Sequence, residues 1–305
     1  MASSSSNSAD ALVVGGDGMV GSHLAAHLRA RGLTVHATTR RPDRAGPGTP
    51  LVDLTAGGWP DLDGARYGTA FLCAAQARLA QCRADPEGSR RVNVEGAAAL
   101  ARLLSGRGTR VVFLSTNQVF DGSRAPRRAE EAVCPVSLYG RQKAEAEAEV
   151  LALPGAAVLR LTKIIHPGLA LFEGWVRDLR AGRPIRPFTD LGLACVTVNL
   201  VSRCLESILH ARDAAGIWQL SAPGDVTYAD AAGYIAERLG ADAALVQPAA
   251  GLAAAQMGGD PPARWTALDC RRVVAELGIR PPEALDAVAS VLDIPAQDAE
   301  RRCHG

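Results

Sequence analysis

The sequence has no apolar run long enough to cross a membrane, which takes about 18 consecutive apolar residues. Its first ten residues, MASSSSNSAD, lack the basic start and the apolar stretch of a secretory signal peptide, so we expect residues 1–10 to form a short disordered leader. Neither sign of charge is in excess, because 33 basic and 32 acidic residues give a net charge of +1. A nucleic-acid-binding protein usually carries a basic stripe. We therefore expect no membrane and no nucleic acid among the partners.

Cysteine and lysine are each informative through their scarcity or arrangement. The seven cysteines are odd in number and scattered, without any CxxC, which argues against a disulfide or zinc framework and favours reduced thiols in a cytoplasmic protein. Among the 33 basic residues there are only two lysines, Lys143 and Lys163. An ammonium is a compact charge whose pKa a protein can tune, whereas a guanidinium stays charged. The two lysines are therefore candidates for functions that arginine cannot perform.

Short apolar runs alternate with stretches of helical period through residues 11–165, which predicts a Rossmann-type, doubly wound parallel α/β sheet. We expect strands at 12–14, 34–38, 51–54, 70–74, 111–115 and 157–162, with helices at 23–31, 86–104 and 139–153. A helix at 196–210 and a strand at 217–221 return to this sheet within residues 191–222. Residues 166–190 and 223–305 are expected to form a small, mainly helical C-terminal substrate lobe. Ligands of such a sheet bind beyond the carboxyl ends of the strands.

A glycine-rich turn follows the first predicted strand. Gly15, Gly18 and Gly21 have the spacing GxxGxxG, and a helix follows at once. Glycines permit a tight turn and a close approach of the backbone to a pyrophosphate, while the helix N-terminus presents free amides to the anion. A purely structural turn is the alternative. The position after the first strand favours a dinucleotide site that includes Met19 and Val20.

The end of the second strand predicts which dinucleotide binds. An acidic residue there would bind the ribose 2′-hydroxyl of NAD, but the sequence has Thr39, Arg40 and Arg41. Two guanidiniums can bind a 2′-phosphate through paired hydrogen bonds, so we expect NADP(H) to be preferred over NAD(H), unless these are ordinary surface arginines. Asp53, followed by Leu54, is placed to accept a hydrogen bond from the adenine amino group, or else lies at an exposed strand end.

Tyr139 and Lys143 form a YxxxK motif at the start of a predicted helix. A spacing of four puts both side chains on one face, so the ammonium can lie near the phenol and favour its ionised form. A tyrosine with a lowered pKa can exchange a proton with a carbonyl oxygen as hydride reaches the carbonyl carbon. Thr116, at the carboxyl end of a strand, can hydrogen-bond the same oxygen and is preferred to Ser115. The alternative is a surface tyrosine beside a solvated lysine.

Together these residues resemble the extended short-chain dehydrogenase/reductase superfamily, and the resemblance covers most of the chain. It rests on the three glycines of the turn, Ala74-Ala75, Asn93, Thr116 and the pair Tyr139/Lys143. Within the superfamily, the segments 115–122 and 139–143 are most similar to the dTDP-4-dehydrorhamnose reductase branch.

The resemblance implies NAD(P) binding and chemistry at a carbonyl or carbinol of a nucleotide sugar. It implies cofactor contacts at Ala74, Ala75 and Thr162. On the substrate side we expect contacts at Gln76, Asn117 and Gln118, and also at Lys163, which follows the sixth predicted strand and is placed toward the crevice. Packing of Lys163 against the cofactor amide is an alternative.

Departures from the superfamily narrow the reaction. Asn117 and Gln118 stand where the 4,6-dehydratase branch has an Asp-Glu pair, and amides cannot transfer protons at neutral pH, so dehydration is not expected. Reduction of a ketone remains the leading interpretation. A nucleotide-sugar 4-epimerase and a non-catalytic, cofactor-binding regulatory subunit are the alternatives.

The segment 190–196 has no arginine for a substrate diphosphate, although many nucleotide-sugar members carry one there. Arginines elsewhere could replace it: Arg78, Arg83, Arg124, Arg127, Arg177, Arg180, Arg183 or Arg186. The helices at 86–104 and 139–153 would suit the face of a homodimer. His23 and His27 lie four apart, but without a nearby acidic or thiol partner we expect no metal site.

Overall fold

In the computed structural model, which describes residues 8–211, 213–250 and 260–292, six parallel strands form the central sheet. Their order is β2-β1-β3-β4-β5-β9. The bounds are β1 (Ser8–Val14), β2 (Val35–Ala37), β3 (Arg66–Leu72), β4 (Arg110–Thr116), β5 (Ala157–Leu161) and β9 (Gly216–Leu220). The strand order reverses between β1 and β3, which is where a doubly wound sheet binds its ligand. The predicted Rossmann-type fold is confirmed.

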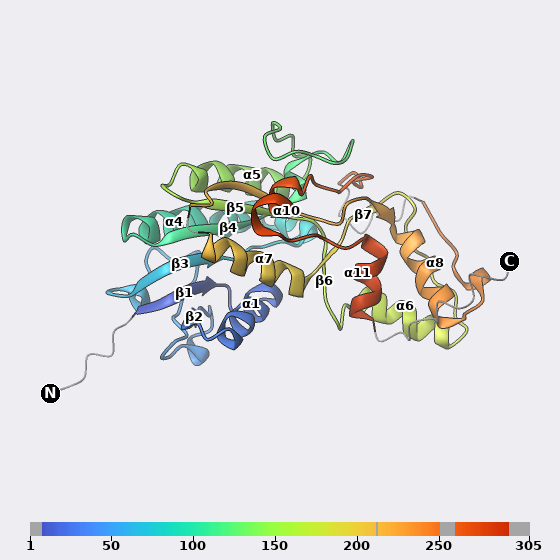
Figure 1. The fold of residues 1–305 in the computed structure, drawn as a ribbon, viewed down its shortest axis with the longest axis horizontal. Helices are drawn as coiled ribbons and strands as arrows, with labels where there is room; N and C mark the ends of the chain where they lie inside the picture. Colours follow the sequence, from blue (N-terminus) through green and yellow to red (C-terminus); the bar gives the residue numbers. More distant parts are fainter. Residues whose placement is uncertain (1–7, 212, 251–259, 293–305) are drawn as a thin grey trace.

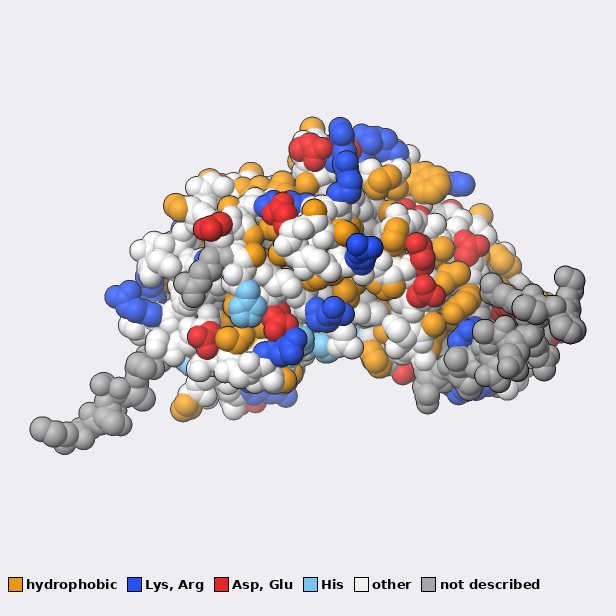
Figure 2. All heavy atoms as spheres, viewed as in Figure 1, with side chains coloured by type: hydrophobic (Ala, Val, Ile, Leu, Met, Phe, Trp, Pro, Cys, Tyr) orange, Lys and Arg blue, Asp and Glu red, His pale blue; other side chains and the backbone are white. Residues whose placement is uncertain are grey.

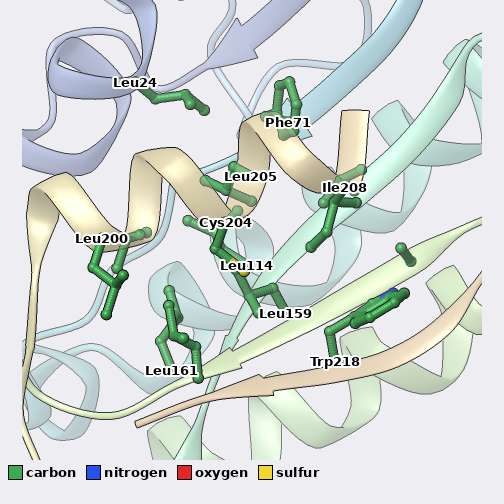
Figure 3. Packing of buried hydrophobic residues seen from close by; sticks show 14 of the residues in the cluster. Leu24, Phe71, Leu114, Leu159, Leu161, Leu200, Cys204, Leu205, Ile208 and Trp218 are labelled. Atoms are coloured by element: carbon green, nitrogen blue, oxygen red, sulfur yellow. The ribbon is translucent and has the colours of Figure 1, made fainter. Parts of the chain in front are cut away.

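Helices cover both faces of the sheet (Figure 1). One face carries α1 (Met19–Ala30), α7 (Val198–His210) and α10 (Arg271–Leu277), and the other carries α4 (Ala97–Gly106) and α5 (Leu138–Leu151). Successive strand residues point to opposite faces, so Val13 packs in the core with α1 and α7, while Leu12 packs in the core with α4 and α5. Figure 3 shows the first core, with α7 lying over the leucines of β4 and β5.

Shorter elements connect these layers. The segment before β4 runs through α2 (Leu79–Ala84), α3 (Pro86–Arg90), a π-helical stretch (Arg91–Gly96) and α4. Short 3₁₀ turns lie at Pro42–Arg44, Pro60–Leu62, Asn117–Val119 and Ala243–Leu245. No helix among the described residues has both the length and the apolar character needed to span a membrane.

Beyond the sheet, a third hydrophobic cluster joins α6 (Ala170–Arg180), α8 (Tyr228–Leu239) and α11 (Ala284–Val291). These three helices lie on the right of Figure 1. Two small sheets support the cluster, β7 (Gly192–Leu193) with β10 (Val226–Thr227), and β6 (Ile164–Ile165) with β8 (Val196–Thr197). Acidic and basic side chains are interspersed on the molecular face in Figure 2, in keeping with the balanced charge of the sequence.

The strand expected at 51–54 does not form. Leu51 makes a single bridge to Thr39. Pro50 has no backbone N–H to donate, and the Asp53 carboxylate accepts hydrogen bonds from the backbone N–H and hydroxyl of Thr55, which turns the chain away. The sheet therefore ends at β2.

Two expected boundaries also differ from the structure. Residues 8–10, assigned to the leader, belong to β1, and residues 1–7 lie outside the described residues. The stretch 271–279, assigned to the lobe, packs against the sheet, because Val273 and Ile279 are buried in the core with α7 and β9.

His27 has an acidic partner that the sequence did not reveal. This partner is Glu206 of α7, whose carboxylate lies 2.8 Å from the imidazole. Among the described residues no group of three or more potential metal ligands occurs.

Candidate active site

The glycine-rich turn after β1 is shaped by backbone contacts that exclude side chains. Gly15 has a φ of +90°, and its N–H donates to the hydroxyl of Thr38 at 3.0 Å. A Cβ atom on Gly21 would lie 2.2 Å from the carbonyl oxygen of Gly15. Gly18 precedes α1, and no side chain caps this helix N-terminus. The turn and the uncapped amides fit a dinucleotide pyrophosphate.

Met19 and Val20 form the first turn of α1, and Met19 is 40% exposed, which is unusual for a large apolar side chain. Ala74 follows β3 and lies against the turn, since a Cβ on Gly15 would come within 2.9 Å of its backbone. Ala75 beside it is exposed. The structure thus brings the carboxyl ends of β1 and β3 together, as the sequence predicts for these cofactor contacts.

The end of β2 has a carboxylate beside it, although the sequence analysis expected no acidic residue there. Thr39 is buried and donates its hydroxyl to the carboxylate of Asp17 at 2.6 Å, and this contact lowers the pKa of Asp17. An acid from the glycine turn therefore lies at the end of β2, where the local sequence has none. Arg44 approaches the same carboxylate at 3.4 Å. Arg40 and Arg41 are exposed, and no partner of either guanidinium occurs in the described parts of the chain.

Asp53 and Leu54, although adjacent in the chain, lie in different surroundings. Asp53 is exposed, and one of its carboxylate oxygens already accepts from Thr55. Leu54 is buried, and its carbonyl lies so close to Gly96 that a Cβ there would collide at 1.9 Å. Leu54 thus holds the π-helical stretch against the sheet.

Tyr139 and Lys143 lie on the buried face of α5. Ser137 caps this helix, accepting from the N–H of Gly140 at 2.9 Å and donating to the side-chain oxygen of Gln118 at 3.1 Å. The Lys143 ammonium donates to the carbonyl of Leu114 at 2.6 Å and lies 3.6 Å from the ring centre of Phe113. The cap and the β4 contacts fix where the tyrosine and lysine stand relative to the end of β4.

The expected lowering of the tyrosine pKa is wrong, because the pKa of Tyr139 is raised. Burial raises the pKa of Tyr139 and lowers that of Lys143 to about 7. The second influence on this phenol, from Cys82, also raises its pKa, so none of the described groups that act on it counteracts the desolvation. Near neutral pH the phenol is therefore protonated.

Thr116 ends β4 and caps the short turn that follows it. Its hydroxyl accepts from the N–H of Gln118 at 3.2 Å and faces the amide oxygen of Asn117 at 3.4 Å. Ser115 is also buried, and its hydroxyl has no hydrogen-bond partner among the described residues. Asn117 and Gln118 are partly exposed beside Thr116.

A buried amide network supports this edge of the site. Asn93 accepts from the N–H of Gln76 at 2.8 Å and donates to the side chain of Gln142 at 2.8 Å. Gln142 in turn donates to Ser89 at 2.9 Å. The network ties the loop after β3 to the turn of α5 that carries Tyr139. The sequence analysis did not predict a role for Gln142 in this network. The one signal that could have indicated it is the position of Gln142 between Tyr139 and Lys143.

Thr162 and Lys163 follow β5. The Thr162 hydroxyl donates to the carbonyl of Ala194, a residue of the segment 191–222 that packs in the hydrophobic cluster of α6, α8 and α11 and not in the sheet core, so it joins β5 to the lobe. Lys163 is exposed, and partial desolvation lowers its pKa. Several arginines considered for a diphosphate are bound to carboxylates: Arg83, Arg124, Arg127, Arg177 and Arg183. Arg177 and Arg180 line a cavity of about 580 Å³ beside α6 and α11.

One buried acid near the site escaped the sequence reasoning. Asp260 is 4% exposed and pairs through one oxygen with Arg83, while its other oxygen has no hydrogen-bond partner among the described residues. It lines a small cavity of about 20 Å³ together with Asn117, Gln118 and Ser137. That volume suits one water or one hydroxyl group. The sequence around Asp260 gave no sign of it, because no charged or polar motif surrounds this residue.

The parallel sheet, the glycine turn at its switch point, and a buried tyrosine and lysine at the same edge define the class of the protein. It is an NAD(P)-binding oxidoreductase of the extended short-chain dehydrogenase/reductase superfamily. Comparison with known proteins specifies the family.

The chain matches the family described as the RmlD substrate binding domain over residues 9–296. It is 31% identical over 244 residues to a dTDP-4-keto-6-deoxy-D-glucose reductase of Streptomyces niveus, covering 78% of this chain and 81% of that protein. A dTDP-4-dehydrorhamnose reductase structure from Clostridium acetobutylicum has a TM-score of 0.81 at 19% identity, covering 93% of this chain and 98% of that chain. One from Bacillus anthracis, in complex with NADP, has a TM-score of 0.79 at 16% identity, covering 92% and 96%. The chain therefore belongs to the RmlD, or dTDP-4-dehydrorhamnose reductase, family.

Proposed function

We propose that the protein reduces a keto group on a nucleotide-linked deoxysugar with NADPH, and that Tyr139 is the general acid. The observation that carries the proposal is that Tyr139 and Lys143 share the buried face of α5, where Lys143 donates to the carbonyl of Leu114 in β4, the strand that ends at Thr116. The Streptomyces niveus relative is named as a reductase of a dTDP-linked 4-ketosugar, which supports this substrate class.

The proposed mechanism assigns one task to each side chain. NADPH, which the glycine turn after β1 would hold, would supply the hydride for the carbonyl carbon. Thr116 donates its hydroxyl hydrogen to the carbonyl oxygen and orients it. Tyr139, kept protonated by burial, transfers its phenolic proton to the same oxygen, and the positive charge of Lys143 stabilises the phenolate that remains.

The proposed preference for NADPH rests on the exposed guanidiniums of Arg40 and Arg41 at the end of β2. Asp17 would repel a 2′-phosphate, but Thr39 and Arg44 already engage its carboxylate. A phosphate binding here would gain charge-assisted hydrogen bonds from arginines that have no other partner in the described chain.

The proposed substrate contacts lie on the other side of Thr116. Asn117, Gln118 and Asp260 contribute polar side chains to the lining of a cavity of about 20 Å³, a volume that would suit a single sugar hydroxyl. Amides in place of carboxylates at 117 and 118 provide no proton-transferring group for an elimination. We assign the lobe around α6, α8 and α11 to the remainder of the nucleotide sugar. Ion pairs from Arg90 to Glu145 and from Arg102 to Glu149 bridge the helices suggested for a homodimer, and dimerisation stays a prediction.

The test is a turnover screen in which purified protein meets NADPH and a set of dTDP-, UDP- and GDP-linked 4-ketosugars. Consumption of NADPH with one of them, and a matching hydroxylated product, is the expected result. The alternative 4-epimerase would instead retain a bound cofactor through purification and interconvert 4-hydroxy epimers without added NADPH. That outcome would overturn the proposed reduction.

A further inference from the structure

A buried ion pair lies next to the catalytic face of α5. Glu147 of α5 and Arg160 of β5 are each 2% exposed. The guanidinium donates three hydrogen bonds to the carboxylate, at 2.7, 3.1 and 3.1 Å. Two charges taken out of water carry a large desolvation cost, and an apolar pair of similar volume is often at least as stable. Stability alone therefore does not account for this pair.

Glu147 follows Lys143 by four residues on the same buried face of the helix. The other groups around the ammonium are neutral: the ring of Phe113, the carbonyl of Leu114 and the thiol of Cys73. Burial raises the pKa of Cys73 to about 12, and that of Tyr139 is raised too, so neither is ionised near neutral pH. Among the described groups that act on Lys143, Glu147 is thus the one that carries negative charge.

Arg160 extends the arrangement to the loop beyond the active site. Its guanidinium donates to the carbonyl of Ala129 at 3.1 Å and lies 5.1 Å from the ring centre of Phe120. Arg127 lies 5.0 Å from the same ring centre. Arg160 therefore fixes the Glu147 carboxylate in place and binds the segment that follows Thr116.

We propose that Glu147 is a positioning residue of the reduction, whose buried carboxylate keeps Lys143 in its ammonium form while Arg160 holds that carboxylate in place. The proposal rests on the proposed role of Lys143 in the reaction.

The pKa of Lys143 lies close to neutral pH, so a change in the charges around it would change its protonation. Desolvation lowers the pKa of Lys143 to about 7, with Glu147 as the largest influence in the opposite direction. Removing a nearby opposite charge lowers the pKa of an ammonium by about 1 or more. The lysine would then be mostly neutral at neutral pH, and the alkaline limb of the pH–rate profile would move to lower pH.

The chain offers a direct measurement because it contains only two lysines. Isotope-labelled lysine gives two NMR signals, which Lys163→Arg assigns, and their titration reports the pKa of Lys143 in cofactor-free protein. We expect Glu147→Gln to lower that pKa by about 1 or more and to shift the alkaline limb of kcat to lower pH by a similar amount. Glu149→Gln, on the exposed face and paired with Arg102, is the matched control and should change neither.

Glu147→Gln leaves Arg160 buried without its partner, so a second variant, Glu147→Gln with Arg160→Met, removes both charges and protects against a loss of folding. The double variant should show the same titration shift. An unchanged Lys143 titration in a folded variant overturns the inference, even where thermal stability falls. A shifted titration with an unchanged pH–rate profile refutes instead the catalytic role of Lys143.

Discussion

Replacing Gly21 with alanine should damage the cofactor site through a collision that the structure locates. The new Cβ would lie 2.2 Å from the carbonyl oxygen of Gly15 and 2.8 Å from its carbonyl carbon, and both are backbone atoms that cannot rotate away. Overpacking of this kind costs about 1–3 kcal/mol, whereas alanine in a helix gains about 1 kcal/mol over glycine. We therefore expect a net loss of stability of up to about 2 kcal/mol.

The larger effect should fall on cofactor binding, because relief of the collision moves the Gly15 turn and the amides beside it. A loss of about 1.4 kcal/mol of binding free energy raises the dissociation constant for NADPH about tenfold, and we expect an increase of at least this size. Denaturant unfolding measures the stability, and titration of NADPH measures the affinity. Gly233→Ala in α8 is the matched control, since Gly233 is exposed and a Cβ there meets nothing within 4 Å. It should stabilise the protein and leave binding alone, and the same behaviour from Gly21→Ala would refute the reasoning.

Three further variants test the site. Lys143→Arg should lose most activity in a turnover assay, because a planar guanidinium cannot replace a compact ammonium against Leu114 and Phe113, and full activity would return Lys143 to a structural role. Arg40→Ala with Arg41→Ala should raise the dissociation constant of NADPH about 10- to 150-fold and spare that of NADH, and equal weakening of both would contradict 2′-phosphate recognition. Asp260→Asn should raise KM for the sugar substrate about tenfold with a smaller change in kcat, and an unchanged KM would remove Asp260 from the substrate site.

Local patterns predicted the parts of the site that depend on spacing along the chain. The glycine turn works through contacts between residues only a few positions apart, such as Gly15 and Gly21. Tyr139 and Lys143 share a helix face because they are four apart. The carboxyl ends of β1, β3 and β4 meet because parallel strands must end at one edge.

Contacts between distant segments could not be predicted in this way. Asp17 reaches Thr39 only once β1 and β2 pair, and Asp260 comes beside Gln118 only after the chain returns from the lobe. The absent strand at 51–54 had the right apolar pattern, but Pro50 and the Asp53 turn outweighed it. The protonation states of Tyr139 and Lys143 could not be predicted from the sequence either, since their pKa values depend on burial.

The central claim is that Tyr139 gives the proton in a reduction of a nucleotide-linked ketosugar. The most direct measurement compares wild type and Tyr139→Phe in a single-turnover assay with NADPH and the substrate identified by the screen, alongside titration of NADPH. We expect the rate of reduction to fall about 100-fold or more while the dissociation constant of NADPH stays nearly unchanged, because general acid catalysis supplies an effect of that size. A phenylalanine variant that reduces the substrate at a near-normal rate would contradict the account.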